Sequence, residues 1–153
     1  MMKKFVAMLF GLGLLATAPA VAHAHCQMPC GIYDDGLRFQ SMLEDATTIT
    51  KAMRQIGDLS ADPAKNANQI TRWVMTKEKT ADHVASVISE YFLQQRIKAP
   101  TKWDKKADEH YVRLLKAAHG ILVTSMKCKQ TADPANAKAL KGLLEDFRKA
   151  YEE

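Results

Sequence analysis

Three residues near the start of the chain, His25, Cys26 and Cys30, offer an imidazole and two thiols within a short stretch. If the chain were cut to begin at His25, its α-amine and the first amide nitrogen would add two further donors. An amine, an amidate and two thiolates lie naturally in one plane, which favours Ni(II) or Cu(II) over zinc, whose preferred geometry is tetrahedral. The imidazole of His25 can then reach an axial position. The pattern therefore predicts a metal-binding hook at a chain end.

The residues around the second thiol suit a tight loop that folds onto one ion. Pro29, which precedes Cys30, removes a backbone donor, and Gly31, which follows it, allows a positive φ. Tyr33 follows three positions later, where its hydroxyl could hang over the open face of a bound metal. A packed aromatic residue is the other interpretation of Tyr33, and the spacing alone leaves both open.

The segment before the hook, residues 1–24, has the three parts of a secretory signal peptide. Two lysines precede an apolar run of 14 residues, Phe5 to Ala18, which is short for a membrane-spanning helix. Cleavage after Ala24 would make His25 the new N-terminus, and the protein would be exported to the periplasm or secreted. Cleavage after Ala22 and a retained N-terminal anchor are the alternatives, and the first of these would destroy the terminal-amine chemistry.

The composition of the remaining 129 residues fits one domain. The signal segment holds two of the 22 basic residues, so the mature chain carries 20 against 17 acidic ones, a net charge near +3. These charges are dispersed and no basic run is interleaved with aromatics, so nucleic acid is not an expected partner, nor is a membrane after signal removal. Three cysteines do not form a disulfide framework, and Cys128 is expected to be a buried or partly exposed free thiol.

The rest of the chain, residues 36–153, predicts four helices and almost no strand. Apolar residues recur at steps of three and four from about 37 to 56. Asp62-Pro63 and Asp133-Pro134 each provide an N-cap followed by proline, and Thr101 with Asp104 can cap another helix. The polar stretch 76–82 leaves open whether the second helix is one or two. The fold class expected is all-α, an up-and-down four-helix bundle with an N-terminal metal-binding hook at 25–35.

The same periodicity predicts which residues are buried. The histidines outside the hook are not expected to form a second metal site. His83, His110 and His119 lie on helices without partners at ligand spacing, so we expect them to be surface or satisfied residues. The predicted core positions are Phe39, Met42, Leu43, Ala46, Ile49, Met53, Ile56, Ile70, Trp73, Val74, Val84, Ile88, Tyr91, Phe92, Trp103, Tyr111, Leu114, Leu115, Ala118, Leu122, Met126, Ala137, Leu140, Leu144, Phe147 and Tyr151.

Residues 25–33 resemble the nickel-binding hook of the nickel-containing superoxide dismutases, whose pattern is His-Cys-x-x-Pro-Cys-Gly-x-Tyr at a processed N-terminus. Stretches 34–39 and 68–98 also resemble that family's bundle. At two variable positions of the hook, this chain has Gln27 where the family often has aspartate and Met28 where it often has leucine. The fixed positions are all met, by His25, Cys26, Pro29, Cys30, Gly31 and Tyr33.

The resemblance implies disproportionation of superoxide to dioxygen and hydrogen peroxide by Ni(II)/Ni(III) cycling, with one nickel ion per subunit. It implies His25, Cys26 and Cys30 as nickel ligands, Tyr33 as a residue that gates the vacant side, and a homohexamer as the assembly. Superoxide is then the small anionic substrate. Two other classes stay open from the residues alone, a secreted helical metal-binding protein without turnover and a thiol-disulfide exchanger. The three-residue spacing between the cysteines differs from the usual redox pair.

Overall fold

A computed structural model describes residues 35–102 and 104–153 of the chain. The predicted signal peptide, nearly all of the hook and Trp103 lie outside these residues. In chain order the elements are α2 (Asp35–Leu59), α3 (Pro63–Ser86), the π-helical η2 (Val87–Arg96), α4 (Lys105–Gln130) and α5 (Pro134–Glu152). No strand occurs among the described residues.

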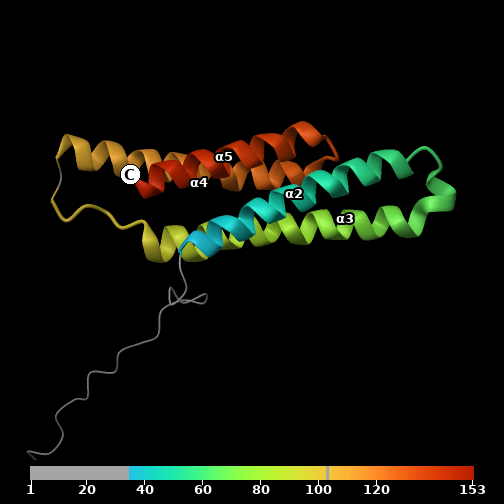
Figure 1. The fold of residues 1–153 in the computed structure, drawn as a ribbon, viewed down its shortest axis with the longest axis horizontal. Coiled ribbons are helices and arrows are strands. Elements are labelled where there is room, and N and C mark those ends of the chain that lie inside the picture. Colours follow the sequence, from blue (N-terminus) through green and yellow to red (C-terminus); the bar gives the residue numbers. More distant parts are fainter. Residues whose placement is uncertain (1–34, 103) are drawn as a thin grey trace, which may run out of the picture.

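The helices form an elongated up-and-down bundle in which α2, α3 with its continuation η2, α4 and α5 alternate in direction (Figure 1). Helix α2 packs against α3 and α5, and α4 completes the ring by packing against the same two neighbours. The all-α four-helix fold predicted from the sequence is thus confirmed. One end of the bundle gathers the start of α2, the end of η2, the start of α4 and the end of α5 (Figure 1). The hook joins the bundle at this end, because residue 34 leads directly into α2.

The helix starts follow the predicted capping chemistry. The side chains of Asp62, Asp104 and Asp133 each accept a hydrogen bond from a backbone N–H in the first turn, at 3.3, 2.8 and 2.9 Å. Proline occupies the first positions of α3 and α5, where its missing N–H costs nothing. Of the two residues considered for the third helix, the N-cap is Asp104.

The polar stretch 76–82 does not interrupt the second helix, so the open question is settled in favour of one continuous element. What changes is the helix type, because after Ser86 the chain continues as the π-helical η2. The Ile97 N–H closes this segment with a hydrogen bond of 2.8 Å to the Phe92 carbonyl, five residues back. Such wide turns occur frequently at functional sites.

Most predicted core positions are buried, including the seam from Ala137 to Phe147 on α5. The prediction that Met126 is buried is wrong, since 51% of its surface is exposed. The buried stripe of α4 runs through Ile121, Ser125 and Cys128, and Met126 lies one residue to its side. Several other predicted positions are only half-buried: Leu43, Ile70, Trp73, Val74, Tyr111, Leu115, Leu122 and Tyr151. Within the described part of the chain, no helix is long and apolar enough to span a membrane.

Candidate functional site

The end of the bundle that receives the hook is organised around the carboxylate of Asp35, the first residue of α2. The hydroxyl of Tyr91 donates a hydrogen bond to Oδ1. Arg96 Nη2 lies 2.6 Å from Oδ2, and the Tyr151 hydroxyl donates to the same oxygen at 2.8 Å. These four residues, which we call the Asp35 cluster, connect the start of α2 to η2 and to the end of α5.

The hydrogen bonds of the Asp35 cluster change the pKa values of its members. Burial raises the pKa of Asp35, but the hydrogen bonds from Arg96, Tyr91 and Tyr151 outweigh it, so that pKa lies below its ordinary value. Burial, with the hydrogen bond to the Asp35 carboxylate, raises the pKa of Tyr91 to about 12. The pKa of Tyr151 is also raised, first by burial and then by the same carboxylate. Asp35 is therefore an anion at neutral pH, and both tyrosines are neutral hydrogen-bond donors.

An aromatic layer supports the Asp35 cluster from within the core. The Phe39 ring centroid lies 4.8 Å from that of Phe92 and 5.6 Å from that of Tyr151. Phe92 and Phe147 meet edge to face at 5.1 Å. Aromatic pairs at these separations stabilise a fold beyond their buried area. The backbone that carries Asp35 therefore rests on a densely packed surface.

Two solvent-open cavities border the Asp35 cluster, and Tyr151 lines both. The first has a volume of about 320 Å³ and is lined by Asp35, Gly36, Phe39, Arg148, Tyr151 and Glu152. The second, of about 310 Å³, extends from Arg96 and Tyr151 along the chain that leads into α4. Space for a loop or a small molecule thus exists beside Asp35, in the first cavity, and beside its partners Arg96 and Tyr151, in the second.

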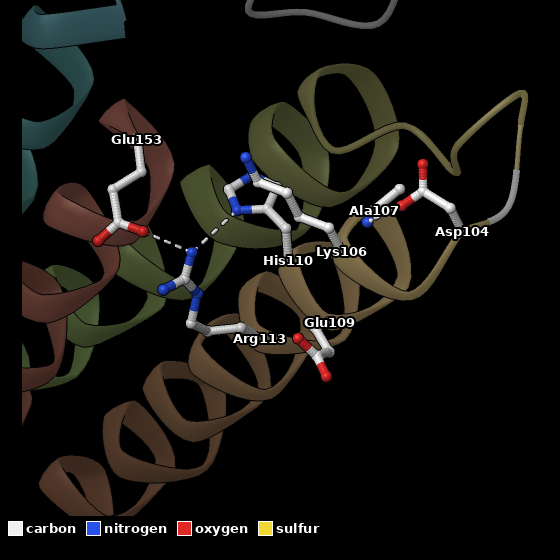
Figure 2. Close-up of a pocket in the computed structure, with 7 residues that line it drawn as sticks. All are labelled: Asp104, Lys106, Ala107, Glu109, His110, Arg113 and Glu153. Carbon is white, nitrogen blue, oxygen red and sulfur yellow. Dashed lines mark hydrogen bonds and ion pairs between the residues drawn. The ribbon is translucent and has the colours of Figure 1, made fainter.

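A larger groove of about 740 Å³ lies nearby, along the start of α4 (Figure 2). Its centre is Arg113, whose Nη2 lies 3.0 Å from His110 Nδ1 and 2.5 Å from Glu153 Oε2 (Figure 2). The side chains concerned are largely exposed, so we interpret the groove as a surface charge network. The residues that line it are Asp104, Lys106, Ala107, Glu109, His110, Arg113 and Glu153.

The histidines of the described chain are surface or satisfied residues, as predicted. His83 Nδ1 lies 2.6 Å from Asp45 Oδ2, His110 contacts Arg113, and His119 is exposed. Burial raises the pKa of Asp45, although its hydrogen bond with His83 opposes this. Residues 35–102 and 104–153 contain no group of three or more His, Cys, Asp or Glu side chains placed to hold a metal ion.

Cys128 is a free cysteine buried in the core, in line with the sequence prediction. Burial raises the pKa of its thiol to about 11, against the opposing effect of the Lys77 charge. Sequence analysis did not identify Lys77 as a buried residue. Its ammonium donates to the carbonyls of Cys128 and Lys129 at 2.8 and 2.5 Å and to Glu78 Oε1 at 2.7 Å. The spacing of Lys77 from Ala81 and Val84 could have indicated its burial, because steps of four and three residues place it on the buried face of α3.

The predicted site residues His25, Cys26, Cys30 and Tyr33 lie outside the described residues. What the structure adds is the Asp35 cluster, which sequence analysis missed. Asp35 stands two residues after Tyr33, and its partners lie 56, 61 and 116 residues further along the chain. No local pattern connects residues at such separations.

The imidazole and thiol groups that precede the helical bundle in the sequence are ligand types that suit transition metals. A model of the nickel-containing superoxide dismutase family matches residues 20–153, most of the chain. The protein therefore belongs to the nickel-containing superoxide dismutase family. It is an oxidoreductase that uses nickel to disproportionate superoxide. Searches of curated proteins and of solved structures found no significant match.

Proposed function

We propose that His25, Cys26 and Cys30 hold the nickel ion of this dismutase, at an N-terminus created by cleavage after Ala24. The observation that carries this proposal is the position of the three residues. They follow a small-x-small cleavage sequence, Ala22-His23-Ala24, and they fall inside the stretch that matches the family model. The bundle is then the scaffold that receives the hook.

The donor set fits nickel on chemical grounds. An amine, an amidate and two thiolates favour planar coordination, and anionic sulfur and nitrogen donors stabilise the higher oxidation state of the metal. Nickel bound in this way would accept an electron from one superoxide, giving dioxygen, and donate it to a second, giving hydrogen peroxide. In the proposal, Cys26 would provide sulfur and its amide nitrogen, Cys30 the second sulfur, and His25 its amine and its imidazole.

The role proposed for Tyr33 is to gate the open side of the site and to orient superoxide or a water that delivers a proton. Its place in the chain supports this role, because it lies three residues after Cys30 and two before the Asp35 anchor. A fully extended chain advances about 3.6 Å per residue, so the Cα of Tyr33 lies within about 7 Å of the Cα of Asp35. This short connection supports a role for Tyr33 close to the Asp35 cluster.

Two further proposals concern compartment and assembly. Export to the periplasm or the medium is supported by the lysines, apolar run and cleavage sequence of residues 1–24. Assembly as a homohexamer is supported by family membership alone. N-terminal sequencing of the secreted fraction tests the first, and native mass spectrometry of the mature protein tests the second.

The ligand assignment is tested with cysteine variants of the mature protein, measuring nickel by elemental analysis and superoxide decay by pulse radiolysis. Cys26→Ser and Cys30→Ser should each lose bound nickel and turnover, because each removes a soft anionic donor. Cys128→Ser is the matched control, since this thiol is buried and protonated. Retention of nickel by both hook variants, or its loss from the Cys128 variant, would show that the assignment is wrong.

A further inference from the structure

We propose that Asp35 is a positioning residue for the nickel site, and that its carboxylate fixes the point and direction in which the hook leaves the bundle. The proposal rests on the placement of nickel in the hook argued above. The residues that act on Asp35 are Tyr91, Arg96 and Tyr151. Each contacts the carboxylate from an element other than α2.

Covalent geometry ties the hook closely to this carboxylate. Cys30 lies five residues before Asp35, and at about 3.6 Å per residue their Cα atoms are separated by at most about 18 Å. Nickel held by Cys30 would therefore lie in the half of the bundle that contains Asp35. Any rotation of the first turn of α2 moves the attachment point of the hook, so a contact that fixes this turn also restricts the hook.

The bonding of Asp35 is suited to fixing this turn. Two hydroxyls and a guanidinium converge on its two oxygens, and hydrogen bonds to a charged group are stronger than those between neutral groups. The donors also come from two separate elements, η2 and the end of α5. The guanidinium of Arg96 is further stacked over the Tyr91 ring, 5.9 Å from its centroid. The carboxylate is thus restrained in more than one direction.

Asp45 offers a comparison on the same helix. The Asp45 side chain is 19% exposed and the Asp35 side chain is 20% exposed, and each carboxylate has a nitrogen partner at 2.6 Å, His83 Nδ1 for Asp45 and Arg96 Nη2 for Asp35. Asp45 lies ten residues further from the hook and pairs with His83. A purely structural role would make the two carboxylates equivalent in their effect on nickel. A positioning role makes only Asp35 affect the metal.

The test uses the mature nickel-loaded protein and three variants, Asp35→Asn, Tyr151→Phe and the control Asp45→Asn. Three quantities are measured: the rate of nickel loss to excess chelator, the electron paramagnetic resonance signal of the oxidised nickel, and the thermal midpoint. We expect Asp35→Asn to lose nickel about tenfold faster, since charged hydrogen bonds that hold the attachment point are lost, and to broaden the resonance signal. Tyr151→Phe should show a smaller change in the same direction.

The control should retain the nickel-loss rate and the resonance signal of the wild type, whatever its thermal midpoint. If Asp35→Asn and Asp45→Asn release nickel at the same rate with the same signal, the positioning role is excluded. Tyr151→Phe keeps the carboxylate, so it decides the question even if Asp35→Asn does not fold. Failure of the ligand assignment is distinguishable, because Cys26→Ser and Cys30→Ser would then retain nickel.

Discussion

Two charged side chains of the bundle differ in burial: Asp35 at the hook end is 20% exposed, and Lys77 on α3 is 4% exposed. Each has three partners, and each links elements that are distant in sequence. Their partners differ in kind. Two of the three acceptors of Lys77 are backbone carbonyls in the last turn of α4, whereas Asp35 is bound only by side chains in these contacts.

This difference indicates two different roles. The last carbonyls of any helix lack partners within the helix and carry partial negative charge, so a buried ammonium there stabilises the fold itself. Two tyrosines and an arginine around one carboxylate are a specific arrangement, and it stands where the hook is attached. We therefore expect the Lys77 contacts to determine stability and the Asp35 cluster to determine the metal site as well.

The largest effect on stability should come from Lys77→Met, which preserves the length of the side chain and removes its charge. The variant leaves two helix-end carbonyls and Glu78 without their donor, and we expect a loss of about 2–4 kcal/mol in the free energy of unfolding. Urea denaturation measures this loss. Nickel content and the resonance signal should stay unchanged in the folded variant, and a change in either would break the proposed division of roles.

A change of smaller size should appear in the acid range at Asp35. Because its pKa is lowered in the folded protein, its ionised form stabilises the fold above pH about 4, and this stabilisation is lost as pH falls through the folded pKa. The stability difference between wild type and Asp35→Asn should therefore shrink as the pH falls below about 4. Denaturation curves at several pH values measure it.

Asp45 should respond with the opposite sign. Burial raises its pKa in the folded protein, so the folded state binds a proton more readily than the unfolded state. The wild type should gain stability relative to Asp45→Asn as pH falls through that raised pKa. Parallel behaviour of the two variants would contradict the contrast drawn between the two carboxylates of α2.

The smallest effect is expected at Cys128. Cys128→Ser places a hydroxyl in the core and should cost about 1–2 kcal/mol, without loss of nickel. In the reduced apo-protein, iodoacetamide should modify Cys26 and Cys30 and leave Cys128 unmodified until the protein is unfolded, because burial raises the pKa of that thiol to about 11. Peptide mass spectrometry distinguishes the three positions, and rapid modification of native Cys128 would contradict its burial.

Local sequence patterns predicted much of the fold and less of what surrounds the site. The Asp-Pro starts of α3 and α5 and the seam of α5 depend on neighbouring residues, and the structure confirms them. Three-residue and four-residue steps also suggested Met126 as buried, because periodicity does not specify which of two adjacent stripes faces the core. The change to η2 after Ser86 has no comparable local pattern.

The candidate site divides in the same way. The proposed nickel ligands come from a short contiguous motif, since a hook at a chain end uses residues that are close in sequence. The contacts of Asp35 with Tyr91 and Tyr151 depend on three helices meeting at one end of the bundle. Only tertiary structure reveals such contacts, and Lys77 with Cys128 is a second example.

The most direct test of the central claim is nickel content with and without a free N-terminus at His25. The mature chain beginning at His25 should bind about one nickel ion per subunit and be active. The same chain with a single alanine added before His25 should lose nickel binding and turnover while its helical circular dichroism is unchanged, because the ligand amine becomes a peptide nitrogen. Equal nickel content and activity in the two chains would contradict a metal site built on the processed terminus.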